Sequence, residues 1–142
     1  MFNHFVPCMH RENVFVMSYD VFLQGFVNGE PVLGGGVQMR EVLAPFIVRE
    51  EPDSRCLLIE YGDGTADVYL ADDGMMANHI SGEQPWELVV KGAAGAGWVI
   101  MPVGCPTCLT EEAQRADLPE SIREDAVVTA TGADLLRAIR SS

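Results

Sequence analysis

The spacing of apolar residues along the chain predicts its first two elements. Between Val14 and Phe26 the chain is rich in Val, Phe and Tyr at alternating positions, which is typical of a strand. The glycines at 34–36 lack a following Gly-Lys-Ser/Thr, so they predict a flexible linker rather than a phosphate-binding loop. From Val37 to Phe46 the apolar spacing fits one face of a short helix, which Pro45 is expected to end.

The run RCLLIEYGDGTADVYLADDG has the clearest pattern in the chain. Two segments of strand-forming residues flank a turn at Gly62–Thr65, and a second turn follows at Asp72–Gly74. This arrangement predicts a β-hairpin. A third strand is expected from Met75 to Ile80.

The next segment predicts a helix. Ser81 and Gln84 have the spacing of a capping box, in which the serine side chain caps the helix start. Gly92, Gly95 and Gly97 each lower the helix propensity by up to about 1 kcal/mol. We therefore expect the second half of this helix to be weak, or to pack closely against the sheet.

Short strands and helices alternate in the last third of the chain. Strands are expected from Trp98 to Met101 and from Ala126 to Ala130, with a loop from Pro102 to Cys108. Thr110 is expected to cap a short helix that Pro119 ends.

Thr131, with Asp134 three residues later, is expected to cap the terminal helix ADLLRAIR. The predicted order is β-α-β-β-β-α-β-α-β-α. Three successive strands between helices favour an α+β fold with a mixed or antiparallel sheet over a doubly wound parallel sheet. We expect residues 17–142 to form one such domain and residues 1–16 to be a flexible N-terminal extension, with Met17 as an alternative start.

The composition narrows the classes of function. The 142 residues include 21 acidic and 9 basic side chains, which gives a formal net charge of −12, and 48% of the residues are hydrophobic. This charge argues against nucleic acid and anionic membranes as partners and favours a basic protein. No apolar run approaches the roughly 20 residues that span a bilayer. Since the N-terminus also lacks a secretory signal pattern, we expect a cytoplasmic protein.

Cys105 and Cys108 form a C-P-T-C motif between a predicted strand and a predicted helix. The motif suggests either a thioredoxin-like redox pair or half of a zinc site. A redox pair is disfavoured because the helix is expected to begin after both cysteines, where it lowers a thiol pKa little. The further zinc ligands that the chain offers are Cys8, His10, Cys56 and His79. They do not form a second close pair outside the N-terminal extension, so no cofactor is expected and zinc remains the alternative.

The hairpin region contains the acidic residues Asp63, Asp67, Asp72 and Asp73. Their spacing does not match a calcium-binding loop, and we expect solvated aspartates at hairpin tips. Glu60 and Asp67 lie on the two arms of the hairpin and would act as paired carboxylates only if buried. His79, on an apolar strand, is expected to be satisfied or half-exposed.

Three segments, MSYDVFLQGFVNGEP, LLIEYGDGTADVYL and the tail with LPE and GADLLRAI, carry a resemblance to known proteins. Residues 17–142 resemble small uncharacterised bacterial proteins that open with M-S-Y-D and end in a short helix. The shared motifs are structural and supply no catalytic residue. Small acidic proteins of this kind are often immunity proteins of bacterial toxin systems, so the resemblance implies an immunity or inhibitor role.

Such a role predicts a protein-binding module rather than an enzyme. Nuclease toxins are basic, so an acidic inhibitor would be attracted to them and would cover their clefts with carboxylates. The residues expected at the binding surface are Asp63, Asp67, Asp72 and Asp73, with Tyr61, Tyr69 and Trp86 as aromatic anchors. The alternative is a thiol or zinc-site protein centred on Cys105 and Cys108.

Overall fold

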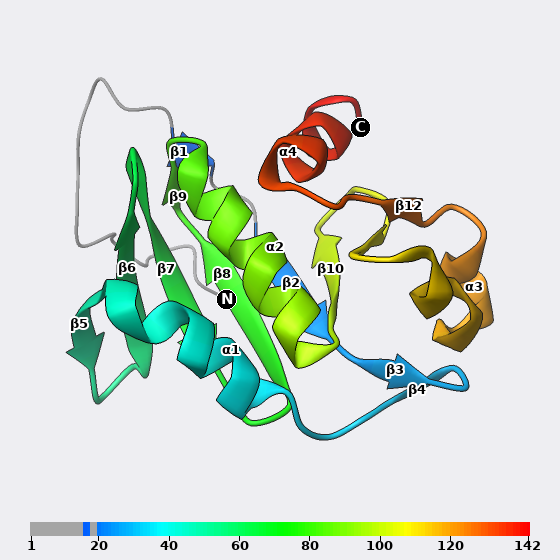
Figure 1. Ribbon diagram of the computed structural model, residues 1–142, viewed down its shortest axis with the longest axis horizontal. Helices are drawn as coiled ribbons and strands as arrows, with labels where there is room; N and C mark the ends of the chain where they lie inside the picture. Colours follow the sequence, from blue (N-terminus) through cyan, green and yellow to red (C-terminus); the bar gives the residue numbers. More distant parts are fainter. Residues whose placement is uncertain (1–15, 18–19) are drawn as a thin grey trace.

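Eight strands form one mixed sheet in the computed structural model, which describes residues 16–17 and 20–142 (Figure 1). In order across the sheet they are β12 (Val127–Val128), β11 (Cys108–Leu109), β10 (Val99–Pro102), β2 (Val21–Gln24), β8 (Gly74–Asn78), β7 (Gly64–Leu70), β6 (Cys56–Tyr61) and β5 (Ile47–Glu51). Neighbours pair antiparallel, except that β11 and β12 are parallel. Two shorter pairs are β1 (Val16–Met17) with β9 (Ile80–Ser81), and β3 (Phe26–Val27) with β4 (Glu30–Pro31). The predicted α+β fold with a mixed sheet is confirmed.

Three helices cover one face of this sheet, and we call it the helix face (Figure 1). They are α1 (Gly36–Leu43), α2 (Gln84–Ala96) and α4 (Gly132–Arg140). Helix α2 packs directly on β6, β7, β9 and β10, while α1 and α4 pack against α2 from either side. The shorter turns are η1 (Ala44–Phe46), η2 (Glu112–Asp117) and α3 (Glu120–Arg123). In the part of the chain that the structure describes, no helix has the length and apolar character needed to cross a membrane.

The main hydrophobic core lies between the sheet and these helices. Successive side chains of a strand point to opposite faces, so every second residue of the central strands reaches this core. The sheet residues that do so include Val21, Leu23, Leu57, Ile59, Ala66, Val68, Met75, Ala77 and Ile100. The helices contribute Met39, Leu43, Trp86, Leu88, Leu135 and Ile139, among others. The terminal helix buries one apolar stripe, as its sequence predicts.

The other residues of the central strands point to the opposite face, which we call the rear face. Strand pairing arranges their side chains in two rows. The first row runs Cys56, Tyr69, Met76 and Phe22, and the second runs Leu58, Asp67 and Asn78. Asp20 extends the second row, since its carboxylate accepts a hydrogen bond from the Asn78 amide at 3.2 Å.

A smaller hydrophobic cluster covers the rear side of β10 and β11. Val99 and Leu109 from these strands pack with Leu118 and Ala126, which flank α3. This cluster anchors the segment that connects β11 to β12, drawn in yellow to orange in Figure 1.

The predicted hairpin is confirmed as β6 and β7, with Tyr61 paired to Gly64, and β8 follows as expected. The predicted Ser81 cap of α2 is wrong, because Ser81 belongs to β9 and its hydroxyl accepts a hydrogen bond from the Thr65 amide at 3.0 Å. The helix begins after Glu83 and has no cap from that residue's side chain. Asp63, at the hairpin tip, supplies the cap instead.

The prediction of a flexible linker at 34–36 is wrong, because Gly35 and Gly36 lie in close contact with other parts of the chain. Gly35 has φ +102°, and a Cβ on it would meet the Trp98 indole at 2.3 Å. A Cβ on Gly36 would lie 2.5 Å from the Ala71 carbonyl oxygen, and the Gly36 amide donates to the Asp72 carbonyl at 2.9 Å. Only glycine allows the chain to pass this close to the β7–β8 turn.

Several predicted boundaries also differ from the structure. Strand β5 was not predicted, and the expected loop from Pro102 to Cys108 ends in β11. Thr110 caps nothing, since Glu111 and Gln114 form the capping box of η2. The Thr131 cap of α4 is confirmed, because its hydroxyl accepts from the Asp134 amide at 3.1 Å. Of the predicted extension 1–16, Val16 lies in β1 and residues 1–15 are outside the described part.

Candidate functional site

The predicted acidic binding residues do not gather into one patch. Asp63 lies in the β6–β7 turn, whereas Asp72 and Asp73 lie in the β7–β8 turn at the other end of β7. Seven strand residues separate the two turns, a distance of roughly 20 Å at about 3.3 Å per residue. The two turns therefore present separate acidic groups.

Asp63 has a structural role in its turn. Its carboxylate accepts hydrogen bonds from the amides of Gln84 at 2.8 Å and Glu83 at 3.1 Å, at the start of α2. These amide donors hold the pKa of Asp63 below its ordinary value. The carboxylate thus satisfies two of the free amides at a helix start and matches the positive end of the helix dipole.

The predicted aromatic anchors are not available at the surface as expected. Trp86 is fully buried in the main core, so its assignment to a binding surface is wrong. Tyr61 is half-buried and packs edge-on against Phe46, with ring centroids 4.7 Å apart. Tyr69 is also half-buried, in the first row of the rear face.

Asp67 is buried, which overturns the prediction of a solvated aspartate at a hairpin tip. It lies in the middle of β7 opposite Leu58 and Asn78, and it is 2% exposed. Burial raises the pKa of the Asp67 carboxyl, and the charge of nearby His79 opposes that rise. Glu60 is exposed and lies opposite Thr65, so the two carboxylates do not form a buried pair.

Asp67 belongs to a polar network on the rear face. His79 Nδ1 lies 3.4 Å from Asp67 Oδ2 and 3.0 Å from Asn78 Oδ1. Since both oxygens are acceptors, Nδ1 carries the hydrogen of the imidazole. The Asn78 amide nitrogen in turn donates to Asp20. His79 is partly buried, as expected, and the network links β7, β8 and the start of β2.

The backbone at His79 is unusual. Its φ is +51°, a left-handed conformation that a residue with a Cβ adopts rarely. His79 is the single residue between β8 and β9, and the turn there directs its ring toward Asp67. Such a conformation persists only where the surroundings hold it, and here the ring is held by its hydrogen bond with Asn78 Oδ1 and by its proximity to the Asp67 carboxylate. Sequence reasoning missed this network because the φ of His79 has no sequence signature.

The two cysteines of the C-P-T-C motif give no support to the thiol and zinc interpretations. Cys108 is fully buried in the main core, and burial raises the pKa of its thiol to about 11. That shift is opposite to the one that activates a thiolate. Cys105 packs partly buried against the same core. Within residues 16–17 and 20–142, no group of three His, Cys, Asp or Glu side chains could hold a metal ion. Cys8 and His10 lie outside the described residues.

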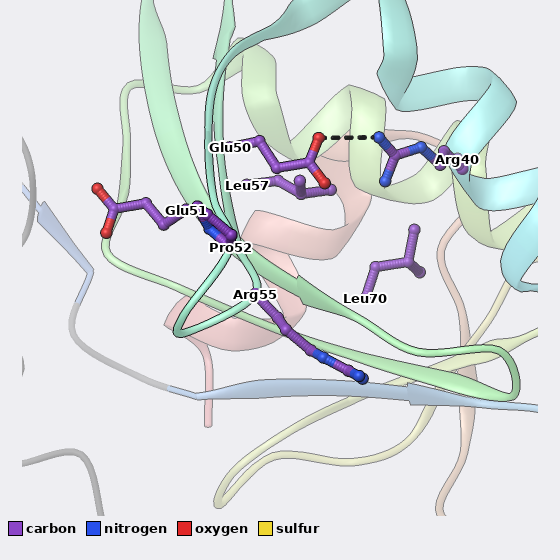
Figure 2. Close-up of a pocket in the computed structure, with 7 residues that line it drawn as sticks. All are labelled: Arg40, Glu50, Glu51, Pro52, Arg55, Leu57 and Leu70. Carbon is purple, nitrogen blue, oxygen red and sulfur yellow. Dashed lines mark hydrogen bonds and ion pairs between the residues drawn. The ribbon is translucent and has the colours of Figure 1, made fainter.

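A surface hollow of about 300 Å³ lies where α1, β5 and the β5–β6 loop meet (Figure 2). Arg40 and Glu50 face each other across it at 3.0 Å, and Leu57 and Leu70 also line it. Figure 2 shows that Glu51 points away from this pair. Both partners of the pair are about half-exposed, and such ion pairs contribute little energy. Within the hollow, Arg40 and Glu50 therefore neutralise each other.

Residues 110–128, which we call the acidic lobe, contain six carboxylates and two arginines. The carboxylates are Glu111, Glu112, Asp117, Glu120, Glu124 and Asp125. All of them except Asp117 are exposed.

The two arginines of the acidic lobe make contacts within it. Arg115 donates to Glu112 at 2.6 Å and to the Arg123 carbonyl at 2.8 Å. Arg123 donates to the Leu118 carbonyl at 2.9 Å. The guanidinium groups are thus occupied by local acceptors, and the lobe keeps an excess of exposed negative charge.

An exposed edge strand adjoins these carboxylates. Val127 and Val128 form β12, the last strand of the sheet, and both side chains are exposed. The Val127 amide donates to the Thr107 carbonyl, which precedes β11, at 2.9 Å, and the Thr129 amide donates to the Leu109 carbonyl of β11 at 2.7 Å. The intervening amide and carbonyl of Val128 therefore point away from β11, toward the open edge.

Comparison of the chain with protein-family models, curated proteins and solved structures gave no significant match. The arrangement of the side chains is accordingly the basis for any functional assignment.

Proposed function

We propose that the protein is a non-enzymatic binding module whose acidic lobe docks onto a basic protein, as an immunity or inhibitor protein does with a basic toxin. The observation that carries this proposal is the excess of exposed carboxylates on residues 110–128. Five of them are exposed, while Arg115 and Arg123 contact acceptors inside the lobe. The site differs from the predicted one, which was centred on the β6–β7 hairpin.

The physical basis is electrostatic attraction followed by short-range contact. A net charge of −12 speeds the approach of a basic partner, and the exposed carboxylates Glu120, Glu124 and Asp125 set the orientation in which it docks. Val127 and Val128 supply apolar area next to Glu124 and Asp125. An interface needs such a buried apolar centre, because exposed charges alone contribute specificity and association rate more than affinity.

The open edge of β12 offers a way to hold the partner. An extended peptide can add to a sheet edge through main-chain hydrogen bonds, and the outward amide and carbonyl of Val128 provide one donor and one acceptor. A peptide bearing lysines or arginines would place them near Glu124 and Asp125. We expect the cytoplasm as the compartment in which the two proteins meet.

The test is a charge reversal with a matched control. The lobe variant is Glu120→Lys with Glu124→Lys and Asp125→Lys, and the control is Glu41→Lys with Asp53→Lys and Asp72→Lys. All six side chains are exposed, so both variants change the net charge equally. Each tagged chain is purified from its own cells in low and high salt.

We expect a basic protein to co-purify in near-stoichiometric amount with the unmodified chain and with the control variant. The lobe variant should bind that protein roughly tenfold to a hundredfold more weakly, and added salt should weaken the unmodified complex. Equal binding by both variants, or recovery of acidic partners alone, would show that the acidic lobe is not the docking surface.

A further inference from the structure

One guanidinium group at the surface hollow has no acceptor among the described residues. Arg55 lines the hollow, and no hydrogen bond or ion pair joins its side chain to another described residue. The other described arginines each donate to an oxygen atom; they are Arg40, Arg49, Arg115, Arg123, Arg137 and Arg140. Lys91 of α2 also lacks such a contact within the described residues, but it does not line the hollow. A cation without an acceptor is unexpected in a chain with 21 acidic and 9 basic side chains.

The other charges of the hollow are already engaged. Arg40 is paired with Glu50 at 3.0 Å. Glu51 is paired with Arg49 at 2.7 Å, and Figure 2 shows its carboxylate directed away from the Arg40–Glu50 pair. The charge that remains at the hollow is therefore the positive charge of Arg55, although the protein as a whole carries −12.

Apolar side chains lie beside this free cation. Pro52, Leu57 and Leu70 line the same hollow. In the view of Figure 2, Leu70 lies between the guanidinium groups of Arg40 and Arg55. A guanidinium group donates two parallel hydrogen bonds to a carboxylate, and a neighbouring apolar surface holds the uncharged part of a ligand. The hollow thus combines the two features that recognise an organic acid.

The backbone fixes the position from which Arg55 extends. Residues 52–55 connect β5 to β6, and the pairing of Glu51 with Cys56 closes this turn. Arg55 has φ +60°, a left-handed conformation that a residue with a Cβ adopts rarely and only where the surrounding structure holds it. The turn is ordered before any ligand binds, which lowers the entropy cost of binding.

We propose that this hollow binds a small monocarboxylic acid, whose carboxylate pairs with Arg55 and whose apolar body packs on Leu70 and Pro52. A volume of about 300 Å³ fits a compact acid rather than a nucleotide. Glu50 also lines the hollow, so a ligand with two or more negative charges is repelled more strongly than a monoanion. The site lies at the β5 edge of the sheet, whereas the acidic lobe adjoins β12 at the opposite edge, so it is independent of the proposed protein docking.

A titration of the full-length protein followed by nuclear magnetic resonance tests the proposal. The probe is 3-phenylpropanoate, and 3-phenylpropanamide has the same shape without the charge. The site variant is Arg55→Gln. The control is Lys91→Gln, which removes the same charge from an exposed side chain outside the hollow.

We expect the acid to shift the amide signals around the hollow saturably, with a Kd of about 1 mM. Arg55→Gln and the uncharged probe should each weaken binding at least roughly tenfold, while Lys91→Gln should leave it unchanged. Equal binding by the two variants, equal binding of the two probes, or no saturation up to about 20 mM acid would overturn the proposal.

A second variant should increase the affinity, which unfolding cannot do. Glu50→Gln removes the nearby negative charge and releases the Arg40 guanidinium from its ion pair. It should bind 3-phenylpropanoate roughly threefold to tenfold more tightly. Glu60→Gln, at an exposed carboxylate outside the hollow, is the control and should not change the affinity. Equal affinities of these two variants would contradict recognition of an anion at this site.

A peptide separates two sources of the carboxylate. An acetylated tripeptide that ends in phenylalanine is compared with 3-phenylpropanoate and with its own amidated form. Tighter binding of the tripeptide acid would identify the end of a protein chain as the ligand, and weaker or equal binding would identify a free small acid. Binding of the amidated tripeptide as tight as that of its acid would contradict the proposal in both forms.

Discussion

The two faces of the eight-stranded sheet are buried in different ways. The helix face is entirely apolar at its centre, and α2 packs on it directly. The rear face has one mainly apolar row and one polar row, in which Asp67 and Asn78 are buried together. Apolar packing supplies most of the folding free energy but tolerates changes of shape, whereas a buried polar pair is favourable in only one strand register. The helix face thus accounts mainly for stability, and the rear face for the uniqueness of the register.

The largest expected effect compares neighbouring residues of β6 that point to opposite faces. Ile59→Ala removes a side chain from the main core and should lower the free energy of unfolding by about 3–4 kcal/mol. Leu58→Ala should lower it by roughly half as much, because Leu58 points away from the main core and from the helices packed on it. Urea unfolding with equal m-values measures both. Equal losses would show that the two faces are packed alike.

The next prediction concerns how closely the helices of the helix face approach one another. A Cβ on Gly132 of α4 would lie 2.4 Å from the Glu87 amide nitrogen of α2, so Gly132→Ala should destabilise by about 1–3 kcal/mol. Gly95 of α2 is the control, since its Cβ would meet Val42 at an ordinary 3.8 Å. Gly95→Ala should stabilise by about 0.5–1 kcal/mol. The melting temperature should therefore fall for Gly132→Ala and rise for Gly95→Ala. A change in the same direction for both variants would contradict the close approach of the helices.

The polar row of the rear face makes a prediction about pH. Burial raises the pKa of Asp67 above 3.8, so the folded protein holds this proton more tightly than the unfolded chain does. The corresponding stability is fully present below pH 3.8 and is lost as the pH rises through the raised folded-state pKa. Each unit of pKa difference is worth about 1.4 kcal/mol.

Asp67→Asn removes this dependence. The free energy of unfolding of the variant, relative to the unmodified chain, should therefore increase between pH 3.8 and pH 7. Urea unfolding across this range measures it, with Asp72→Asn as the matched removal of an exposed charge. A relative stability that falls with rising pH would mean that attraction to His79 outweighs burial.

The smallest effect concerns the contact between the hairpin tip and the helix layer. Asp63→Ala removes the cap of α2 and should lower the free energy of unfolding by about 1 kcal/mol. Because the pKa of Asp63 is lowered, its contribution is present above pH 3.8 and disappears as the pH falls through the folded-state pKa. Hydrogen exchange at the Glu83 and Gln84 amides reports the loss. Thr131→Ala, which removes the cap of α4, should leave those two amides unchanged.

Local patterns were sufficient to predict much of the fold. The β6–β7 hairpin, the strand that follows it and the Thr131 cap depend on residues close together in sequence, and the structure contains all three. The Ser81 cap failed because the competing group, Asp63, lies 18 residues earlier and reaches the helix only after the hairpin forms. Strand β5 was missed because most of its residues are exposed and charged at the sheet edge.

The candidate sites were harder to predict because they also depend on residues that are far apart in the sequence. Asp67 lies in a segment full of turn-forming residues, and its burial depends on Leu58 and Asn78 from the two neighbouring strands. Trp86 was placed at the surface because an aromatic residue near a helix start has no sequence feature that marks it as buried. The acidic lobe could not be predicted from sequence, because the carbonyl acceptors of Arg115 and Arg123 are brought close only when the chain folds.

The two tryptophans give the protein a pair of built-in optical reporters. Both indoles are buried, so the native emission should be blue-shifted and should move to longer wavelength on unfolding. The Trp98 indole nitrogen donates to the Gly34 carbonyl at 3.1 Å, while that of Trp86 has no hydrogen-bond partner among the described residues. Single-tryptophan variants would therefore separate opening of the glycine segment from loosening of the helix layer, without an added dye.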